Sequence, residues 1–195
     1  MGETGDLIMW QFIRAAGLLS YAMLSVSVFV GIALKCRFFD GLLKRPWVYE
    51  AHQAVMVAAL GVMFIHLVLV MLDTHVAIGP VGVLIPLLSE WEPVPAALGT
   101  LAFYAVGALT VSTYAQRRIG YKVWRALHFG GYGAWWLALV HGLTAGSDTG
   151  LTGVQFLYWS SAGAVVFVTV FRVILPSPAK QPATRPAMTP QAVAS

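Results

Sequence analysis

The apolar positions of the chain fall into five runs, each near the twenty residues that an α-helix needs to cross about 30 Å of hydrocarbon. The runs cover residues 7–34, 52–72, 96–114, 123–143 and 154–175. The pattern predicts an all-α integral membrane bundle of about five transmembrane helices, which forms a single domain over residues 1–175. Residues 176–195 are rich in Pro, Ala, Gln and Thr, a composition that predicts a disordered tail.

The composition supports a lipid environment. Of the 195 residues, 58% are hydrophobic and only 10% are charged, whereas soluble domains carry about 25% charged residues. The first run is predicted to stay as an anchor rather than to be cleaved as a signal peptide, because it is too long and follows the acidic residues Glu3 and Asp6. The single cysteine, Cys36, excludes an intrachain disulfide and a thiolate-ligated cluster.

The basic residues indicate the orientation rather than a nucleic-acid partner, although the net charge is +4. Lys and Arg gather in the connections 35–49 and 115–122 and in the tail, whereas the N-terminus and the connections 73–95 and 144–153 contain none. The positive-inside rule then places the N-terminus outside and the C-terminus in the cytoplasm of a cell (plasma or inner) membrane. The apolar but proline-broken stretch 74–95 predicts a short interfacial segment over the outer face.

Four histidines lie in or at the ends of two apolar runs, where an ionisable side chain is costly and suggests a function. His52 and His66 are fourteen residues apart on one predicted helix, and His128 and His141 are thirteen apart on another. One span separates these helices, so they run parallel and their histidines pair by depth, His52 with His128 on the cytoplasmic side and His66 with His141 on the outer side. The two levels lie roughly 20 Å apart, which predicts two b-type haems, each with two histidine ligands.

Helical angles fit one pair better than the other. His66 returns to within roughly 40° of His52, whereas His141 lies about 140° from His128 on an ideal helix. Glycines follow His128 directly, and we expect them to permit a kink that redirects the ligand. Zinc favours three or four ligands at one level, so two separate bis-histidine levels favour haem; histidines that only pack between helices are the alternative.

Three further side chains are candidates near these levels. Arg14 either extends to the interface or forms a salt bridge to a propionate of the outer haem. Arg125, three residues before His128, is placed to bind an inner propionate. His75 lies outside the predicted span and is a candidate for contact with an external metal or acceptor, with an ordinary surface histidine as the alternative.

The histidine spacings and the stretch RRIGYKVWRALHFGGYGAWWLALVHG resemble the ferric reductase-like transmembrane domain. Ferric-chelate reductases, NADPH oxidases and the haem subunit of a bacterial methionine sulfoxide reductase system share this domain, and the resemblance covers about residues 10–175. It implies that His52, His66, His128 and His141 ligate two b haems, which carry electrons from a cytosolic flavin to an acceptor on the other face. The commonest form of the family has a sixth span, and its oxidases append a flavin and nicotinamide-binding domain.

The sequence therefore favours a transmembrane b-type cytochrome that passes electrons from a cytoplasmic-side donor to an acceptor on the outer face, as an oxidoreductase or an electron-transfer subunit. No G-x-G-x-x-G follows the last span, so we expect flavin or NAD(P)H to act only through a separate partner, a soluble cytoplasmic reductase, unless a small reductant is the donor. A redox partner on the outer face is a further expectation. The alternatives are a haem-bearing anchor subunit that exchanges electrons between quinone and a separate oxidoreductase, and a non-redox membrane protein.

Overall fold

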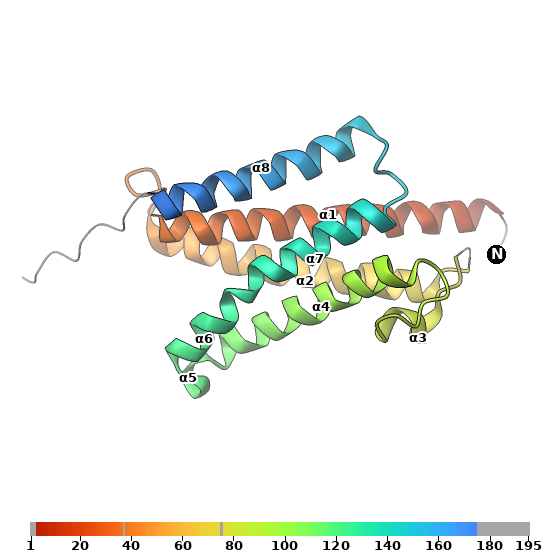
Figure 1. Ribbon diagram of the computed structural model, residues 1–195, viewed down its shortest axis with the longest axis horizontal. Coiled ribbons are helices and arrows are strands. Elements are labelled where there is room, and N and C mark those ends of the chain that lie inside the picture. Colours follow the sequence, from red (N-terminus) through yellow and green to blue (C-terminus); the bar gives the residue numbers. More distant parts are fainter. Residues whose placement is uncertain (1–2, 37, 75, 175–195) are drawn as a thin grey trace, which may run out of the picture.

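The computed structural model describes residues 3–36, 38–74 and 76–174, and every regular element among them is a helix (Figure 1). The elements are α1 (Glu3–Lys35), α2 (Arg45–Leu72), α3 (Gly79–Leu84), α4 (Pro93–Tyr114), α5 (Gln116–Ile119), α6 (Tyr121–His128), α7 (Gly130–Ala145) and α8 (Thr152–Ile174). His75 and the predicted disordered tail 176–195 lie outside the described residues.

Four of these helices, α1, α2, α4 and α8, are long and apolar enough to cross a membrane. The fourth apolar run differs from the single helix that the sequence predicts, because it forms two helices that meet at Phe129. The backbone N–H of Phe129 still bonds to Arg125 at 3.3 Å, but the N–H of Tyr132 bonds to Phe129, only three residues back, at 3.2 Å. Glycine weakens a helix interior, and Gly130, Gly131 and Gly133 coincide with the break.

The long helices form two antiparallel pairs that share a core (Figure 1). α2 packs along α1, α7 packs along α4, and α1 also contacts α7 and α8. Trp135 of α7 is completely buried at the centre, together with Leu24 of α1 and Val106 of α4. The two helices α2 and α7 therefore belong to different antiparallel pairs.

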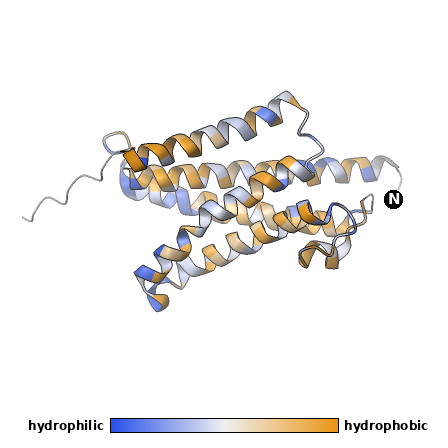
Figure 2. Ribbon diagram, in the orientation of Figure 1, coloured by the Kyte–Doolittle hydropathy of each residue, from blue (hydrophilic) through white to orange (hydrophobic). Residues whose placement is uncertain are grey.

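The outside of the bundle is apolar. Large hydrophobic side chains remain exposed along the helices, among them Phe64, Val111 and Phe156, which is 74% exposed. Figure 2 shows hydrophobic residues along the helices, with hydrophilic residues mainly towards their ends. Such a surface is stable when lipid covers it, so the chain is a multi-pass membrane protein.

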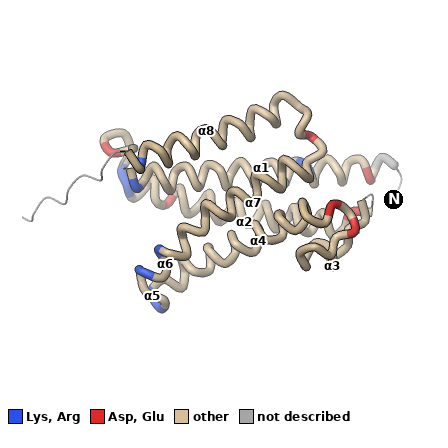
Figure 3. The backbone as a smooth tube through the Cα atoms, in the orientation of Figure 1, with Lys and Arg blue, Asp and Glu red and all other residues tan. Residues whose placement is uncertain are grey.

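Charge separates the two ends of the bundle. The described lysines and arginines other than Arg14 gather at one end, where α1 and α8 end, α2 begins and α5 and α6 lie (Figure 3). The short helix α3 lies at the opposite end, where the sequence predicts an interfacial segment. Its backbone is attached to α4, because the buried hydroxyl of Thr100 donates to the carbonyl of Val83 at 2.7 Å.

Candidate metal centres

The bundle brings the histidines together in the pairs that their predicted depth indicates. His52 of α2 faces His128 at the end of α6, with ring centroids 6.2 Å apart and ring planes at 74°. His66 of α2 faces His141 of α7, with centroids 6.5 Å apart and planes at 69°. We call these the inner pair, at the cationic end, and the outer pair.

The spacing within each pair fits one metal ion between two imidazoles. Two metal–nitrogen bonds of about 2 Å on opposite sides of an ion place the ring centroids roughly 6 Å apart. A hydrogen bond between two rings would bring them closer, and packed rings would make direct contact. No group of three or more His, Cys, Asp or Glu side chains that could hold a metal occurs within the described ranges, so the histidines are arranged as two pairs rather than as one cluster.

Hydrogen bonds fix the tautomer of three of the four rings. Nδ1 of His52 bonds to the carbonyl of Ser27 at 2.9 Å, and Nδ1 of His66 bonds to the carbonyl of Ile13 at 2.9 Å. Nδ1 of His141 bonds to the carbonyl of Pro95 at 2.8 Å. A carbonyl oxygen only accepts, so Nδ1 carries the proton and Nε2 keeps its lone pair. Nδ1 protonation with a free Nε2 is the state in which a neutral imidazole binds a metal.

Each of these three rings also lies against a glycine four residues after the accepting carbonyl. A Cβ at Gly17 would lie 3.1 Å from Cε1 of His66, and one at Gly31 would lie 3.1 Å from Cε1 of His52. A Cβ at Gly99 would lie 2.7 Å from Cε1 of His141. We call this combination of carbonyl i and glycine i+4 the carbonyl–glycine seat. The seat places the ring close to the neighbouring backbone. A Cβ at Gly99 would overlap the ring, and one at Gly17 or Gly31 would push it away by a few tenths of an ångström.

The break at Phe129 accounts for the angular mismatch of the second histidine pair. An unbroken helix would direct His128 and His141 to different faces, yet both rings face α2. The turn of main chain between α6 and α7 supplies the difference, as the glycines after His128 predict.

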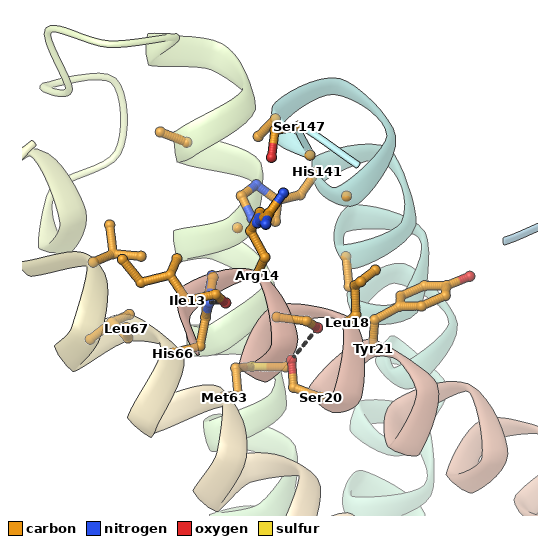
Figure 4. A pocket seen from close by; sticks show the side chains of 18 of the residues that line it. Ile13, Arg14, Leu18, Ser20, Tyr21, Met63, His66, Leu67, His141 and Ser147 are labelled. Carbon is orange, nitrogen blue, oxygen red and sulfur yellow. Dashed lines mark hydrogen bonds between the residues drawn. The ribbon is translucent and has the colours of Figure 1, made fainter. Parts of the chain in front are cut away.

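The outer pair lines a cavity of about 190 Å³ that also receives Arg14 of α1 (Figure 4). Arg14 pairs with Asp148, which follows α7. Its Nε is buried and has no hydrogen-bond partner among the described residues. An unpaired buried donor is costly, so this side of the cavity suits an anionic group such as a carboxylate.

The inner pair lines a larger cavity of about 680 Å³ near the cationic end. Arg125 borders this cavity, and its guanidinium donates to the hydroxyl of Tyr121 at 3.5 Å. Three further cations border it, Lys35, Arg45 and Arg172. The lining is therefore mostly apolar and includes four cationic side chains, which fits a planar apolar group with acidic substituents.

Sequence reasoning missed several residues of the two centres: Gly17, Ser27, Gly31, Gly99, Asp148 and Arg172. One signal could have found two of them. Gly17 and Gly31 are fourteen residues apart on α1, the same spacing as His52 and His66 on the antiparallel neighbour α2. The acceptors are main-chain carbonyls, which leave no trace in the sequence.

No protein-family model, curated protein or solved structure matches this chain.

Proposed function

We propose that this chain is a transmembrane b-type cytochrome of the ferric reductase-like kind, with one haem between the inner histidines and one between the outer histidines. It passes electrons from a donor at the cationic, cytoplasmic end to an acceptor at the outer face. The observation that carries the proposal is the spacing of two opposed imidazole pairs, 6.2 Å and 6.5 Å between centroids. Two separate packing interactions would not require the same metal-sized spacing twice.

The proposal also takes the unit α6–α7 as a fifth span, broken at Phe129. The unit contains 8 residues of α6 and 16 of α7, which together match the thickness of the hydrocarbon core. A break at membrane depth is acceptable where the freed backbone faces protein or a cofactor rather than lipid. With five spans and the cationic end in the cytoplasm of the cell membrane, the N-terminus lies outside and the C-terminus inside.

A bound haem supplies reversible one-electron exchange at its iron. The four histidines would hold the haem irons through their ring nitrogens. The carbonyls of Ser27, Ile13 and Pro95 orient three of these rings and increase the basicity of their Nε2 atoms. The apolar walls exclude water from the spaces between the helices. Arg14 at the outer cavity and Arg125 at the inner cavity are placed to bind propionates.

The test begins with haem stoichiometry in the purified chain. A pyridine haemochrome assay is expected to give two haems per chain, with a b-type reduced-minus-oxidised spectrum. One haem per chain would show that one pair is not a ligand set, and none would refute the cytochrome.

Two variants then separate the roles of the pairs in vesicles reduced from one side. His141→Ala should keep the inner haem and accept electrons from the cytoplasmic side, but it should not pass them outward, because the remaining metal lies roughly 20 Å below the lost level. His128→Ala should block entry while the outer haem stays reducible from outside. Uptake of electrons from the cytoplasmic side by His128→Ala would refute the assignment of the entry haem.

A further inference from the structure

The carbonyl–glycine seat that holds three of the histidines is missing at His128. α4 provides the seat for His141 at Gly99, and the position on α4 thirteen residues further, nearest the level of His128, is Ser112. The hydroxyl of Ser112 donates to the carbonyl of Leu109 at 2.7 Å, and the hydroxyl of Thr113 donates to the same carbonyl at 3.0 Å. Position 112 thus carries a serine side chain where the seat at His141 has a glycine, so the ring of His128 has no glycine against which to approach α4.

His128 is held instead by an aromatic stack. The indole of Trp124 lies 4.9 Å from the His128 ring at an interplanar angle of 27°. Nε1 of Trp124 in turn donates to the hydroxyl of Thr113 at 3.3 Å, which connects the stack to α4. Within the described part of the chain the His128 ring makes no hydrogen bond. The residue is exposed and ends α6 at the helix break.

These differences affect how strongly the ring binds a metal. An Nδ1–H bond to a carbonyl increases the basicity of Nε2 and fixes the ring orientation, and outer-shell partners of this kind are typically worth about 10–100-fold in metal affinity. A stack restrains the plane of the ring but does not polarise the N–H. His128 would therefore be the weakest metal donor of the four, opposite His52, which is held by its bond to the carbonyl of Ser27.

Resting on the cytochrome put forward above, we propose that His128 is an exchangeable axial ligand and that small neutral ligands such as carbon monoxide bind at the inner site in its place. In this exchange Nε2 of His128 leaves with its lone pair, and the carbon lone pair of the incoming molecule takes its position on ferrous iron; no electron or proton is transferred. The outer site, where both rings are held in carbonyl–glycine seats, is expected not to exchange a ligand.

The full-length chain with its haems counted, reduced by dithionite and mixed with carbon monoxide, provides the test. We expect the amplitude of the carbon monoxide difference spectrum to correspond to one of the two haems, which is half of the total haem. Trp124→Leu removes the stack and should increase the rate of carbon monoxide binding by about tenfold or more. Trp124→Phe keeps an aromatic face and should remain near the wild-type rate. The matched control Trp159→Leu on α8 should do the same, because this tryptophan is 70% exposed and lines neither cavity.

The outcomes separate this proposal from the previous one. A chain without haem refutes the cytochrome. A chain with two haems that binds no carbon monoxide, or binds it at both, overturns the exchangeable ligand and leaves the cytochrome intact. An unchanged rate in Trp124→Leu overturns the role of the stack. Trp124→Leu could also lose one haem. In that case, two haems in Trp124→Phe would show that an aromatic ring at position 124 holds His128, and the loss of a haem in Trp124→Phe as well would refute this role.

Discussion

Gly99→Ala is expected to remove the outer haem while leaving the fold and the inner haem in place. The added Cβ would lie 2.7 Å from Cε1 and 2.8 Å from Nδ1 of His141. Carbon atoms in contact sit at about 3.5 Å or more, so the ring must withdraw by roughly 0.8 Å. Metal–ligand distances tolerate only about 0.2 Å of change, and the withdrawal also stretches the 2.8 Å bond from Nδ1 to the carbonyl of Pro95.

The expected magnitude follows from this displacement. Loss of the orienting bond alone should cost about 10–100-fold in metal affinity, equivalent to about 1.4–2.7 kcal/mol, and the misplaced Nε2 adds to it. The substitution otherwise favours the helix by about 1 kcal/mol, because alanine has the higher helix propensity. The loss of haem should therefore not be accompanied by loss of helicity.

The assay compares Gly99→Ala with Gly107→Ala on the same helix. A Cβ at Gly107 meets no atom within 4 Å, so this control keeps two haems and gains slightly in thermal stability. Haem per chain by pyridine haemochrome and helicity by circular dichroism are measured for both. Two fully retained low-spin haems in Gly99→Ala would refute the seat as a requirement for ligation, and equal losses in both variants would show that alanine in α4 disturbs the helix itself.

Three further predictions concern other parts of the molecule. Burial raises the pKa of the Cys36 thiol above its usual range, with a partial opposing effect of Arg172; an impermeant maleimide should label Cys36 only from the cytoplasmic side, slowly at neutral pH and faster as rising pH forms the thiolate, and labelling from outside would overturn the orientation. Arg14→Gln removes a positive charge and should lower the midpoint potential of the outer haem by tens of millivolts, whereas Asp148→Asn should raise it by a similar order; redox titration checks the signs, and shifts in the same direction would exclude a direct charge effect. Thr100→Val removes the buried bond to α3 and should destabilise the attachment of that segment by about 1 kcal/mol, seen as faster amide exchange in 79–84; the exposed Thr144→Val is the control, and equal exchange in both variants would contradict the role of Thr100.

The sequence predicted the all-helical membrane bundle because apolar runs of spanning length report directly on lipid burial. It also predicted which histidines meet, since parallel helices place residues of similar register at similar depth. It did not predict that the fourth run forms two helices, α6 and α7, because glycines after His128 indicated that a kink was permitted but not how far the helix would be interrupted.

The environment of the histidines could be predicted only in part. Arg14 was recognised as unusual, but its partner Asp148 lies 134 residues away on a connecting segment, and no local pattern relates the two. The acceptors for the histidine Nδ1 protons are main-chain oxygens, whose position depends on how α1 and α4 rotate about their axes. Only the equal spacing of Gly17 and Gly31 with His52 and His66 carried that information in the sequence.

The carbonyl–glycine seat has a consequence for how this protein tolerates genetic change. An acceptor on a side chain disappears with one substitution, whereas the main-chain oxygens of Ile13, Ser27 and Pro95 persist whatever residue occupies those positions. Haem binding should therefore be more sensitive to substitution four residues further along the helix, at Gly17, Gly31 and Gly99. Every other amino acid adds a Cβ against the histidine ring at these positions. In a saturation-mutagenesis experiment selected for haem content, the three acceptor positions should accept other side chains of similar size, because Ile13 and Ser27 are buried. The three glycines should accept fewer residues, and Gly99, where the overlap is closest, should accept almost none.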